Sequence, residues 1–480
     1  MGKRIKRITK RKENYAQWYL DVIEAADLAE HSPVKGCMII KPYGYAIWEN
    51  IQMILDTAIK ARGVKNVYFP LFIPQSFLKR EKEHVKGFAP EFITVTHAGG
   101  KKLEEPLIIR PTSETIIYET FSKWIKSYRD LPLLINQWAN IARWELRPRL
   151  FLRTVEFLWQ EGHTVHSTEE EAEVKAREML EVYRSFAEDY LALPVISGRK
   201  TESEKFPGAV RTYCVEGMMQ DGKALQVGTS HMLGQNFAKV FKVKFLDEKG
   251  TEQYGWQTSW GVSTRLIGAI IMAHGDDKGL VLPPRLAPIQ VVVIPLWTSK
   301  EEREIVLAKA DFIAQNLRNL YKISVEVDKR EHIRVGPKFF EWEKKGVPIR
   351  IEIGPKDVAK ESVVVVRRDT SEKELVTEKR INFRIRKMLE QIQESLLSKA
   401  LAFQKENSYV VDSWDEFKTL IEKGVFIYAH WCGSANCESK VKEETKATIR
   451  SIPLNQKKEE GKCIFCGKSS NGRVIFARAY

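Results

Sequence analysis

The chain has 480 residues, of which 43% are hydrophobic, and its 77 basic and 63 acidic residues give a net charge of +14. This length exceeds one hydrophobic core and predicts about three domains, and the apolar content excludes a disordered chain. The positive charge favours a polyanionic partner such as nucleic acid, although lysine-rich solvated faces alone also give basic proteins. No apolar run reaches the roughly 18 residues of a membrane span, so we expect a cytoplasmic protein.

The first twelve residues are strongly basic but are not followed by an apolar run, and they lack serine-rich amphipathic spacing. These properties exclude a secretory signal and a mitochondrial presequence. The segment is therefore expected to be a disordered extension or an arm that contacts phosphates.

Hydrophobic spacing predicts the elements that follow. Helices are expected over residues 15–29 and 47–61, and short strands over 67–73 and 107–109. Pro111 with Thr112 or Ser113 begins a further helix that continues to about Tyr128. This strand-to-helix junction carries Arg110, Thr112 and Glu114.

Residues 141–163 predict an antiparallel hairpin with its loop at 147–149. Alternation places Arg143 and Glu145 on one face of the first strand, and on the second strand one face holds Phe157, Trp159, Glu161 and His163. A capping box at 168–171 then begins a long helix to residue 190. Strands are expected over 225–231 and 241–246, and Ser263 begins a helix to residue 273 with Arg265 in its first turn.

The proline-rich segment 282–288 is typical of a domain linker. Beyond it, strands and helices alternate, which predicts a small α/β domain with a mixed sheet; the expected elements are 290–295, 301–319, 323–327, 338–345, 349–353 and 362–367. A charged amphipathic helix over 379–403 then leads to a cysteine-rich end.

Guanidinium and carboxylate groups concentrate on the elements between residues 110 and 166, beside Leu, Ile, Phe and Trp. Ionised groups are rarely buried unless they are paired, so this density indicates a pocket that binds charge. The expected ligand carries charges of both signs.

Four of the six cysteines lie near the C-terminus, as Cys432-x4-Cys437 and Cys463-x2-Cys466. In a reducing compartment this spacing favours a tetrahedral zinc site, because thiolates are soft ligands and disulfides are disfavoured. Unpaired structural thiols, or a site that has lost its metal, are the alternatives. Cys37 and Cys214 are interpreted as small core side chains.

Several of these motifs together resemble prolyl-tRNA synthetases, of the class II type that carries a C-terminal zinc domain. The resemblance extends from Tyr15 to Tyr480. It rests on Gly36-Cys-Met38 with Pro42, Arg110-Pro-Thr-Ser-Glu-Thr115, the Arg143–His163 hairpin, Gly228-Thr-Ser-His231, Trp260-Gly261 with Arg265, the run from Gly346 to Pro355 and the four cysteines. It implies an α/β (α+β) chain in three parts: a catalytic domain on an antiparallel sheet (1–284), an α/β anticodon-binding domain (285–400) and a small zinc-binding domain (401–480).

The resemblance further implies activation of L-proline with ATP and Mg²⁺, followed by transfer of proline to tRNA(Pro). The catalytic arginines are expected to be Arg143 and Arg265, since positive groups screen the charge that develops at the α-phosphate. The residues expected around ATP are Arg143, Glu145, Arg153, Thr154, Gln226, Thr229, Ser263 and Arg265. Those expected around proline are Thr112, Glu114, Arg143, Trp159, Glu161, His163, Phe206 and His231.

Other features are implied by the same resemblance. A pocket that discriminates only by size gains about 1 to 3 kcal/mol per methylene, so alanine and cysteine mischarging is expected. The short stretch between His163 and Arg265 leaves no room for a cis-editing domain that would correct it. Glu343 and Arg350 are expected to contact anticodon guanines, structural Zn²⁺ to bind the four cysteines, Tyr480 to reach back toward the active site, and the chain to form a homodimer.

Plainer readings remain open at this stage. His163, His231 and His274 are each compatible with ordinary core histidines, Trp159 and Phe206 with core aromatics, and Glu343 with Arg350 with a surface pair. At the level of function, the alternatives are a catalytically silent paralogue that binds tRNA, and a sister class IIa synthetase for threonine, serine, histidine or glycine.

Overall fold

An eleven-stranded sheet dominates the computed structural model, which describes residues 7–77 and 92–480. Its strand order is β20-β21-β25-β22-β9-β10-β11-β14-β8-β7-β3. The catalytic half consists of β9 (Val195–Arg199), β10 (Arg211–Met218), β11 (Ala224–Gly234), β14 (Trp256–Ser263), β8 (Glu156–His166), β7 (Leu133–Ala142) and β3 (Lys65–Asn66). All neighbours in this half pair antiparallel except β3 and β7. The expected antiparallel catalytic sheet is therefore confirmed.

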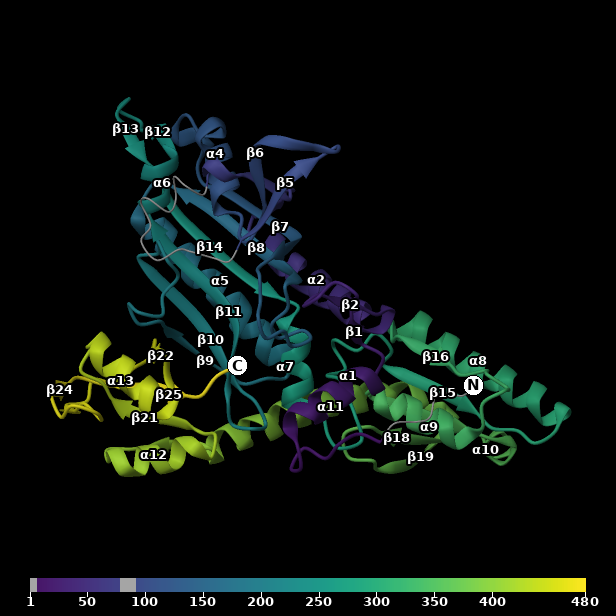
Figure 1. Cartoon of the computed structure of the whole chain (residues 1–480). Helices are drawn as coiled ribbons and strands as arrows, with labels where there is room; N and C mark the ends of the chain where they lie inside the picture. Colours follow the sequence, from purple (N-terminus) through teal and green to yellow (C-terminus); the bar gives the residue numbers. More distant parts are fainter. Residues whose placement is uncertain (1–6, 78–91) are drawn as a thin grey trace.

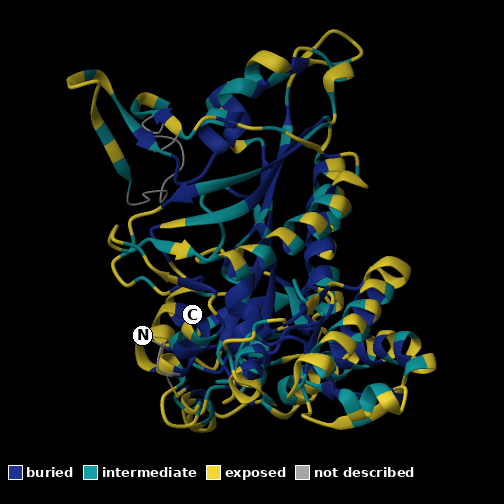
Figure 2. Ribbon diagram, turned by 90° about the vertical axis from the view of Figure 1, so that its right-hand side faces the viewer, coloured by how far each residue is buried: buried dark blue, intermediate teal, exposed yellow. Residues whose placement is uncertain are grey.

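Helices cover this sheet and bury its core. Helix α5 (Glu169–Asp189) begins where the Thr168 hydroxyl accepts from the Glu171 amide, and it packs on β11 and β14. The helices α1 (Tyr15–Ala25), α2 (Pro42–Lys60) and α7 (Arg265–His274) complete the main core, which contains Trp18, Trp48 and Trp260. Figure 2 shows buried residues gathered in the sheets and on the helix faces against them.

Smaller elements flank the catalytic sheet. The pair β1 (Ala29–His31) and β2 (Met38–Ile40) precedes α2, and a three-stranded sheet contains β4 (Phe72–Pro74), β6 (Lys101–Ile109) and β5 (Ile93–Ala98). Beyond it come α4 (Glu114–Trp124), the short 3-10 helix η1 (Tyr128–Asp130), α6 (Asn236–Phe241) and the hairpin β12 (Lys244–Leu246) and β13 (Glu252–Tyr254). Phe121, Phe237 and Phe245 are among the residues that form their shared core.

A second sheet of five strands forms the middle part of the chain, in the order β16-β15-β17-β18-β19. The strands are β15 (Val291–Pro295), β16 (Val325–Val327), β17 (Ile349–Ile353), β18 (Ser362–Arg367) and β19 (Lys373–Thr377), with helices α8 (Lys300–Tyr321), α9 (Val335–Lys344) and α10 (Pro355–Ala359). β15 runs parallel to β16 and β17, and the later pairs are antiparallel. The expected mixed sheet is confirmed.

The C-terminal part returns to the first sheet. Helix α11 (Glu378–Glu406) runs from the five-stranded sheet toward α12 (Trp414–Glu422) beneath the catalytic part (Figure 1). The strands β20 (Ser408–Val410), β21 (Phe426–His430), β25 (Arg473–Ala477) and β22 (Thr448–Pro453) extend the catalytic sheet, because β22 pairs with β9. Helix α13 (Ala435–Thr445) and the short pair β23 (Gly461–Lys462) and β24 (Ser469–Ser470) complete this part.

Some expected elements differ from the structure. Helix α1 stops at Ala25, because Asp27 has a φ of 58° and turns the chain into β1. The strand expected over 67–73 is wrong in its first five residues. There the Phe69 amide donates to the Gln137 side chain and the Phe69 carbonyl accepts from Arg110, so side chains replace strand partners.

Three further segments differ from the elements expected there. Strand β7 ends at Ala142, so Arg143 and Glu145 lie beyond the strand on which they were expected. Residues 236–241 form α6, which shortens the strand expected over 241–246. The segment 282–288, expected as a domain linker, packs Leu282 and Leu286 into the main core.

The basic N-terminal segment is described only from Arg7 onward, and the prediction for residues 1–6 lies outside the described residues. In the described part, Ile8 is buried and Arg11 forms an ion pair with Asp277 at 3.2 Å. The expected disordered extension is therefore wrong for residues 7–12, which fold against the catalytic part.

Candidate active site

A cavity of about 320 Å³ opens between the central strands β8, β11 and β14 and the loop 200–207. Alternation along β8 points four side chains into it, as the sequence predicted: Phe157, Trp159, Glu161 and His163. The cavity also receives Thr112 and Glu114 from the start of α4, and Arg143 from the end of β7. Acidic, basic and aromatic groups therefore meet in one pocket.

Glu161 is the centre of a buried hydrogen-bond network. Its Oε1 accepts from the Ser113 hydroxyl and from the Gln137 amide, both at 2.5 Å, and its Oε2 lies 3.0 Å from His163 Nε2. The other His163 nitrogen lies 3.2 Å from the Tyr118 hydroxyl. Because every partner is a donor or can be one, the network suits an ionised carboxylate.

Arg143 is held beside the aromatic side chains of β8. Its Nε donates to the Pro111 carbonyl at 2.8 Å, and its guanidinium lies 5.7 Å from the Trp159 ring and 5.9 Å from the Phe157 ring. Burial lowers the pKa of Arg143, while Glu114 and Glu161 act to raise it. The Thr112 hydroxyl donates to Glu114 beside it. The cation therefore shares the cavity with two carboxylates that attract it.

Two stacked rings, Phe206 and His231, also line the cavity. Phe206 stacks on His231 with ring centres 4.6 Å apart, and the Thr212 hydroxyl bridges the Phe206 amide and His231 Nδ1 at 2.9 and 3.0 Å. Burial, with His163 as a second cause, lowers the pKa of His231 to about 3. His231 is therefore neutral at pH 7 and forms a flat, uncharged wall.

The neighbouring part of the cavity is lined by Gln226 and Thr229 from β11, Ser263 from β14, and Arg265. Arg265 begins α7, and the Ser263 hydroxyl accepts from its amide at 3.3 Å. Burial, then the positive charges of Arg153 and Arg143, lower the pKa of Arg265 to about 10. Mutual repulsion of these guanidiniums is relieved when an anion binds between them.

Three predicted ATP residues lie outside the cavity lining. Glu145 and Arg153 form an ion pair at 3.6 Å in the loop between β7 and β8, and the Arg153 side chain is 55% exposed. Thr154 is buried, and its hydroxyl donates to the Glu156 carbonyl at 2.7 Å. Arg153 acts on this part of the cavity through its charge on Arg265.

A side chain at position 162 would clash with the neighbouring strand, which explains the glycine there. A Cβ there would lie 2.0 Å from the Trp260 ring, which packs on Gly162 as its cross-strand neighbour on β14. Only glycine leaves room for the indole over position 162. Because side chains alternate along β8, Glu161 and His163 point to the other face of the sheet, where they line the cavity.

The sequence analysis missed the charged loop that borders the cavity. Lys200, Glu204 and Lys205 line it together with Phe206. The available signal was a run of charges, residues 199–205, immediately before Phe206-Pro-Gly208.

A buried ion cluster beneath this loop was also missed. Lys200 Nζ lies 2.7 Å from Glu216, and Arg450 from β22 lies 3.1 Å from both carboxylate oxygens of Glu216. Burial acts to raise the pKa of Glu216, but the two cations outweigh it and lower the pKa. Only tertiary structure brings Arg450 here, because it is 234 residues distant in sequence.

Two other residues singled out in the sequence, His274 and Tyr480, do not line the main cavity. His274 is a core histidine: its Nε2 donates to the Leu191 carbonyl at 2.7 Å, and burial lowers its pKa to about 4. The Tyr480 hydroxyl donates to Asp221 at 2.6 Å, and its ring lies 6.0 Å from the guanidinium of Arg149 in the β7–β8 loop. The chain end therefore contacts this loop rather than the lining of the main cavity.

A second cavity of about 210 Å³ in the five-stranded sheet region is lined by both Glu343 and Arg350. They do not form a pair with each other in the structure: Arg350 donates to Glu352 at 2.8 Å, and Glu343 lies 3.2 Å from Lys278. The Arg350 guanidinium also lies 4.3 Å from the Phe339 ring.

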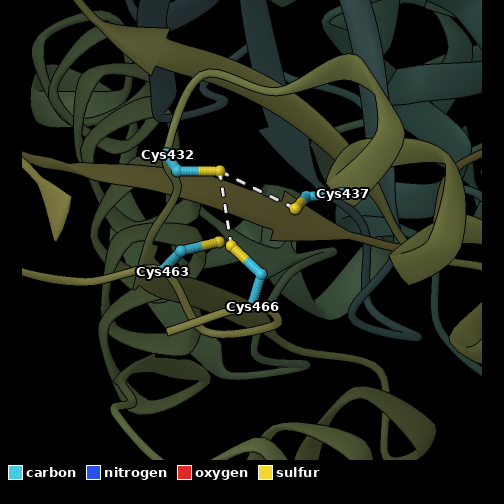
Figure 3. A group of neighbouring side chains, drawn as sticks. All are labelled: Cys432, Cys437, Cys463 and Cys466. Atoms are coloured by element: carbon cyan, nitrogen blue, oxygen red, sulfur yellow. Dashed lines mark hydrogen bonds between the residues drawn. The ribbon is translucent and has the colours of Figure 1, made fainter. Parts of the chain in front are cut away.

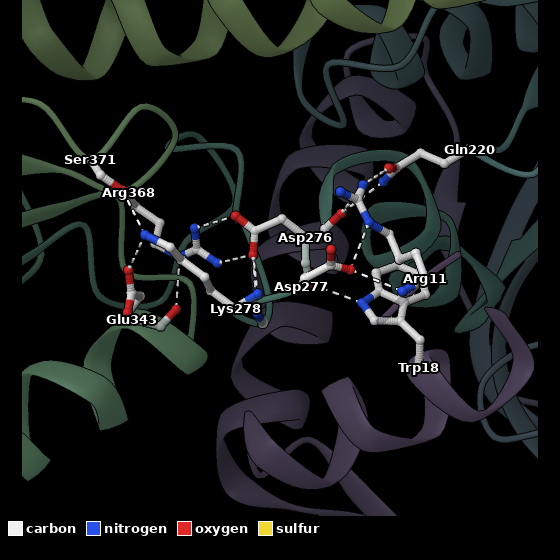
Figure 4. A network of polar contacts seen from close by, with 11 residues as sticks. Arg11, Trp18, Gln220, Asp276, Asp277, Lys278, Glu343, Arg368 and Ser371 are labelled. Carbon is white, nitrogen blue, oxygen red and sulfur yellow. Dashed lines mark hydrogen bonds and ion pairs between the residues drawn. The ribbon is translucent and has the colours of Figure 1, made fainter. Parts of the chain in front are cut away.

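Figure 4 shows the polar contacts that connect residues lining this second cavity with the catalytic part. Arg368 donates to both oxygens of Asp276 at 2.8 and 2.7 Å and to the Glu343 carbonyl at 2.8 Å. Asp276 follows α7, and its carbonyl accepts from the Trp18 indole at 2.9 Å. A continuous polar network therefore connects Glu343 to the end of the helix that Arg265 begins.

The four C-terminal cysteines converge, as Figure 3 shows. Their sulfur atoms all lie within 4.8 Å of one another, and Cys432 lies 3.7 Å from both Cys437 and Cys466. In a tetrahedral site with Zn–S bonds of about 2.3 Å, the sulfur atoms lie about 3.8 Å apart. The donor set and its spacing therefore fit zinc, and none of the four is in a disulfide.

Three models of known protein families match successive parts of the chain. Residues 95–274 match the family model of the class II tRNA synthetase core domain (G, H, P, S and T), residues 290–388 match an anticodon binding domain, and residues 414–480 match the C-terminal model of prolyl-tRNA synthetases. No helix in the described part of the chain is long and apolar enough to cross a membrane.

Full-length relatives give the same result. The chain is 56% identical to a proline–tRNA ligase of Parabacteroides distasonis, with 100% of both chains covered, and 55% identical to that of Chlorobium chlorochromatii, with 99% of each covered. Among solved structures, it is similar to the prolyl-tRNA synthetase of Cryptosporidium parvum complexed with halofuginone and AMPPNP. That match has a TM-score of 0.93 and 43% identity, and it covers 99% of this chain and 97% of the other.

Proposed function

This chain belongs to the prolyl-tRNA synthetase family, and from that premise we propose that proline and ATP meet in the 320 Å³ cavity. The enzyme activates L-proline with ATP and transfers proline to tRNA(Pro). It has no cis-editing domain, because residues 164–264 are used by the catalytic sheet, α5, α6 and a short hairpin. The silent paralogue and the sister synthetases are thereby set aside.

For proline, we assign the part of the cavity around Glu114, Glu161 and His231. The ring ammonium of proline needs a negative acceptor, and Glu114 with Thr112 at the start of α4 supplies one. The methylene groups need an apolar wall, which Trp159, Phe206 and the uncharged His231 supply, while His163 holds Glu161 in place. The proline carboxylate then faces Arg143.

For ATP, we assign the part around Gln226, Thr229, Ser263 and Arg265, with Glu145, Arg153 and Thr154 contributed by the β7–β8 loop. A carboxylate oxygen of proline attacks the α-phosphorus and pyrophosphate leaves. Arg143 touches both anions, and Arg265 meets the leaving phosphates, so the two guanidiniums stabilise the charge that develops in the transition state. Mg²⁺ bound with ATP would screen the charge of its phosphates.

The single observation that carries this assignment is the grouping of two buried carboxylates, Glu114 and Glu161, with the two guanidiniums of Arg143 and Arg265 in one cavity. Proline is a zwitterion and ATP is an anion, so this charge arrangement matches both ligands. The low pKa of His231 supports the same conclusion, since a charged imidazole there would repel the ring ammonium.

For tRNA, we propose that Glu343 and Arg350 read anticodon guanines from the second cavity. Arginine pairs bidentately with guanine O6 and N7, and a carboxylate accepts from its amino edge. The division into a catalytic domain (1–284), an anticodon-binding domain (285–400) and a zinc-binding domain (401–480) belongs to the same proposal.

We also propose structural Zn²⁺ at Cys432, Cys437, Cys463 and Cys466, a homodimer, and a cytoplasmic location. Four thiolates leave no open coordination position, so the metal's contribution is to hold the C-terminal fold together. Exposed Ile39 on β2 and Met53 on α2 support a partner surface near the first class motif. Metal analysis checks the zinc content, and light scattering checks the mass of the assembly.

The deciding experiment is isotope exchange between pyrophosphate and ATP with each of the twenty amino acids, in the absence of tRNA. Exchange with proline well above alanine and cysteine is expected. In the same assay, Arg143→Lys should lower kcat, since a lysine cannot bridge two anions with one planar fork. Unchanged exchange in that variant would refute the assignment of Arg143, and variants of Glu114 test the proline subsite in the same way.

A further inference from the structure

Glu438 connects the cysteine cluster to the loop that borders the proposed proline pocket. It lies in the first turn of α13, directly after Cys437, and only 5% of it is exposed. Its Oε1 accepts from the Thr201 hydroxyl at 2.8 Å, and its Oε2 accepts from the Ser203 hydroxyl at 2.7 Å. One buried carboxylate thus holds two loop residues that lie more than 230 residues away in sequence.

The other side of this loop faces the cavity. The Thr201 carbonyl accepts from the amides of Glu204 and Lys205, which folds residues 201–205 into a turn. Glu204, Lys205 and Phe206 line the cavity from this turn, and Phe206 stacks on His231. A shift of Thr201 and Ser203 therefore moves residues that define the pocket wall.

Further contacts from the C-terminal part hold the same loop at its edges. Lys442, one turn after Glu438 on α13, lies 3.4 Å from Glu204. At the start of the loop, Lys200 Nζ donates to the Arg450 carbonyl at 2.8 Å. These contacts lie on either side of the two hydrogen bonds to Glu438, so the loop packs against α13 and β22.

We propose that Glu438 is a positioning residue for proline binding: it holds the turn 201–205 in the pose that places Phe206 against the proline subsite. This rests on the proposed location of proline in the main cavity. The ATP subsite is lined by β11, β14 and the start of α7, so Glu438 acts on proline affinity and leaves ATP affinity unchanged.

The test compares three full-length variants by pyrophosphate exchange. Glu438→Ala removes both acceptors, and if the loop then adopts the binding pose about a tenth of the time, the KM for proline rises about tenfold. Glu438→Gln restores the shape, and since hydroxyls both donate and accept, it recovers a KM near the original value. Glu444→Ala, on an exposed position of the same helix, is the matched control and should behave as the unmodified enzyme.

The expected pattern is a raised KM for proline, with kcat and the KM for ATP unchanged. Hydrogen exchange followed by mass spectrometry provides an independent readout, in which residues 200–207 exchange faster in Glu438→Ala only. If Glu438→Ala does not fold, the double variant Thr201→Val with Ser203→Ala removes the two donors from the loop side and should raise the KM for proline in the same way.

Two results would overturn the proposal. The first is an unchanged KM for proline in folded Glu438→Ala. The second is a lower kcat in Glu438→Ala, of the same size whether proline or ATP is varied, with both KM values unchanged; a purely structural role predicts this result. Failure of the pocket assignment itself is distinguishable, because His231→Ala would then also leave the KM for proline unchanged.

Discussion

Replacing Glu161 with glutamine separates charge from shape in the proposed proline pocket. The Gln137 amide group is fixed in orientation, because its oxygen accepts from the Phe69 amide at 3.0 Å and its nitrogen donates to Glu161. The oxygen of the new glutamine must therefore face Gln137, and its NH₂ group must face His163. That ring can adapt by moving its proton from Nε2 to Nδ1, where the Tyr118 hydroxyl can accept it.

The magnitude follows from this network. All hydrogen bonds are retained, so the free energy of unfolding of Glu161→Gln should change by less than about 1 kcal/mol. The ring ammonium keeps its acceptor Glu114 but loses the second negative charge, that of Glu161. Two unit charges about 5 Å apart interact by about 1 kcal/mol in water and about 3 kcal/mol at an effective dielectric constant of about 20, so proline binding should weaken by about 1 to 2 kcal/mol. That difference is about five- to thirty-fold in the dissociation constant.

The assay is calorimetric titration of the variant with proline, beside a urea unfolding curve. Glu161→Leu is the contrasting variant, since it removes the acceptor of the buried Ser113 hydroxyl and of His163 Nε2 and should lower the free energy of unfolding by about 1 to 3 kcal/mol for each. Proline affinity unchanged in Glu161→Gln, or a stability loss equal to that of Glu161→Leu, would refute the reasoning.

Three other perturbations have expected outcomes. Glu216→Gln should lower the free energy of unfolding by about 3 to 5 kcal/mol at pH 7, because it leaves two buried cations uncompensated. Since the pKa of Glu216 is lowered in the folded protein, the difference between Glu216→Gln and the unmodified protein should shrink as the pH falls below about 4. Urea unfolding curves at several pH values check this. Gly162→Ala should cost at least about 1 to 3 kcal/mol and abolish most exchange activity, since its Cβ meets the Trp260 ring, and a near-normal melting temperature would contradict this. Asp276→Asn should weaken the bond to Arg368 and lower aminoacylation of tRNA at least about fivefold while pyrophosphate exchange stays close to normal; an equal effect on both reactions would count against a role for this contact in tRNA use.

Periodicity alone predicted most of the fold correctly. Long amphipathic elements such as α5 and α8, and the strand–helix alternation of the middle domain, were predicted because their apolar residues repeat at the spacing of the element that buries them. Predictions failed where side chains or backbone conformations replaced regular pairing. Residues 67–71 are one example, since Phe69 bonds to Gln137 and Arg110, and the end of α1 at Ala25 is another.

For the site, the sequence by itself determined which chemical groups are present: alternation on β8 put Glu161 and His163 on one face, and the cysteine spacing indicated a metal site. Only the tertiary structure decided how distant segments complete that site. It joined β22 to β9, which buried Arg450 against Glu216 and set Glu438 on the loop 200–207. The physical reason is that periodicity reports the burial of a local face, whereas partners hundreds of residues apart are chosen by sheet order, which leaves no local pattern in the sequence.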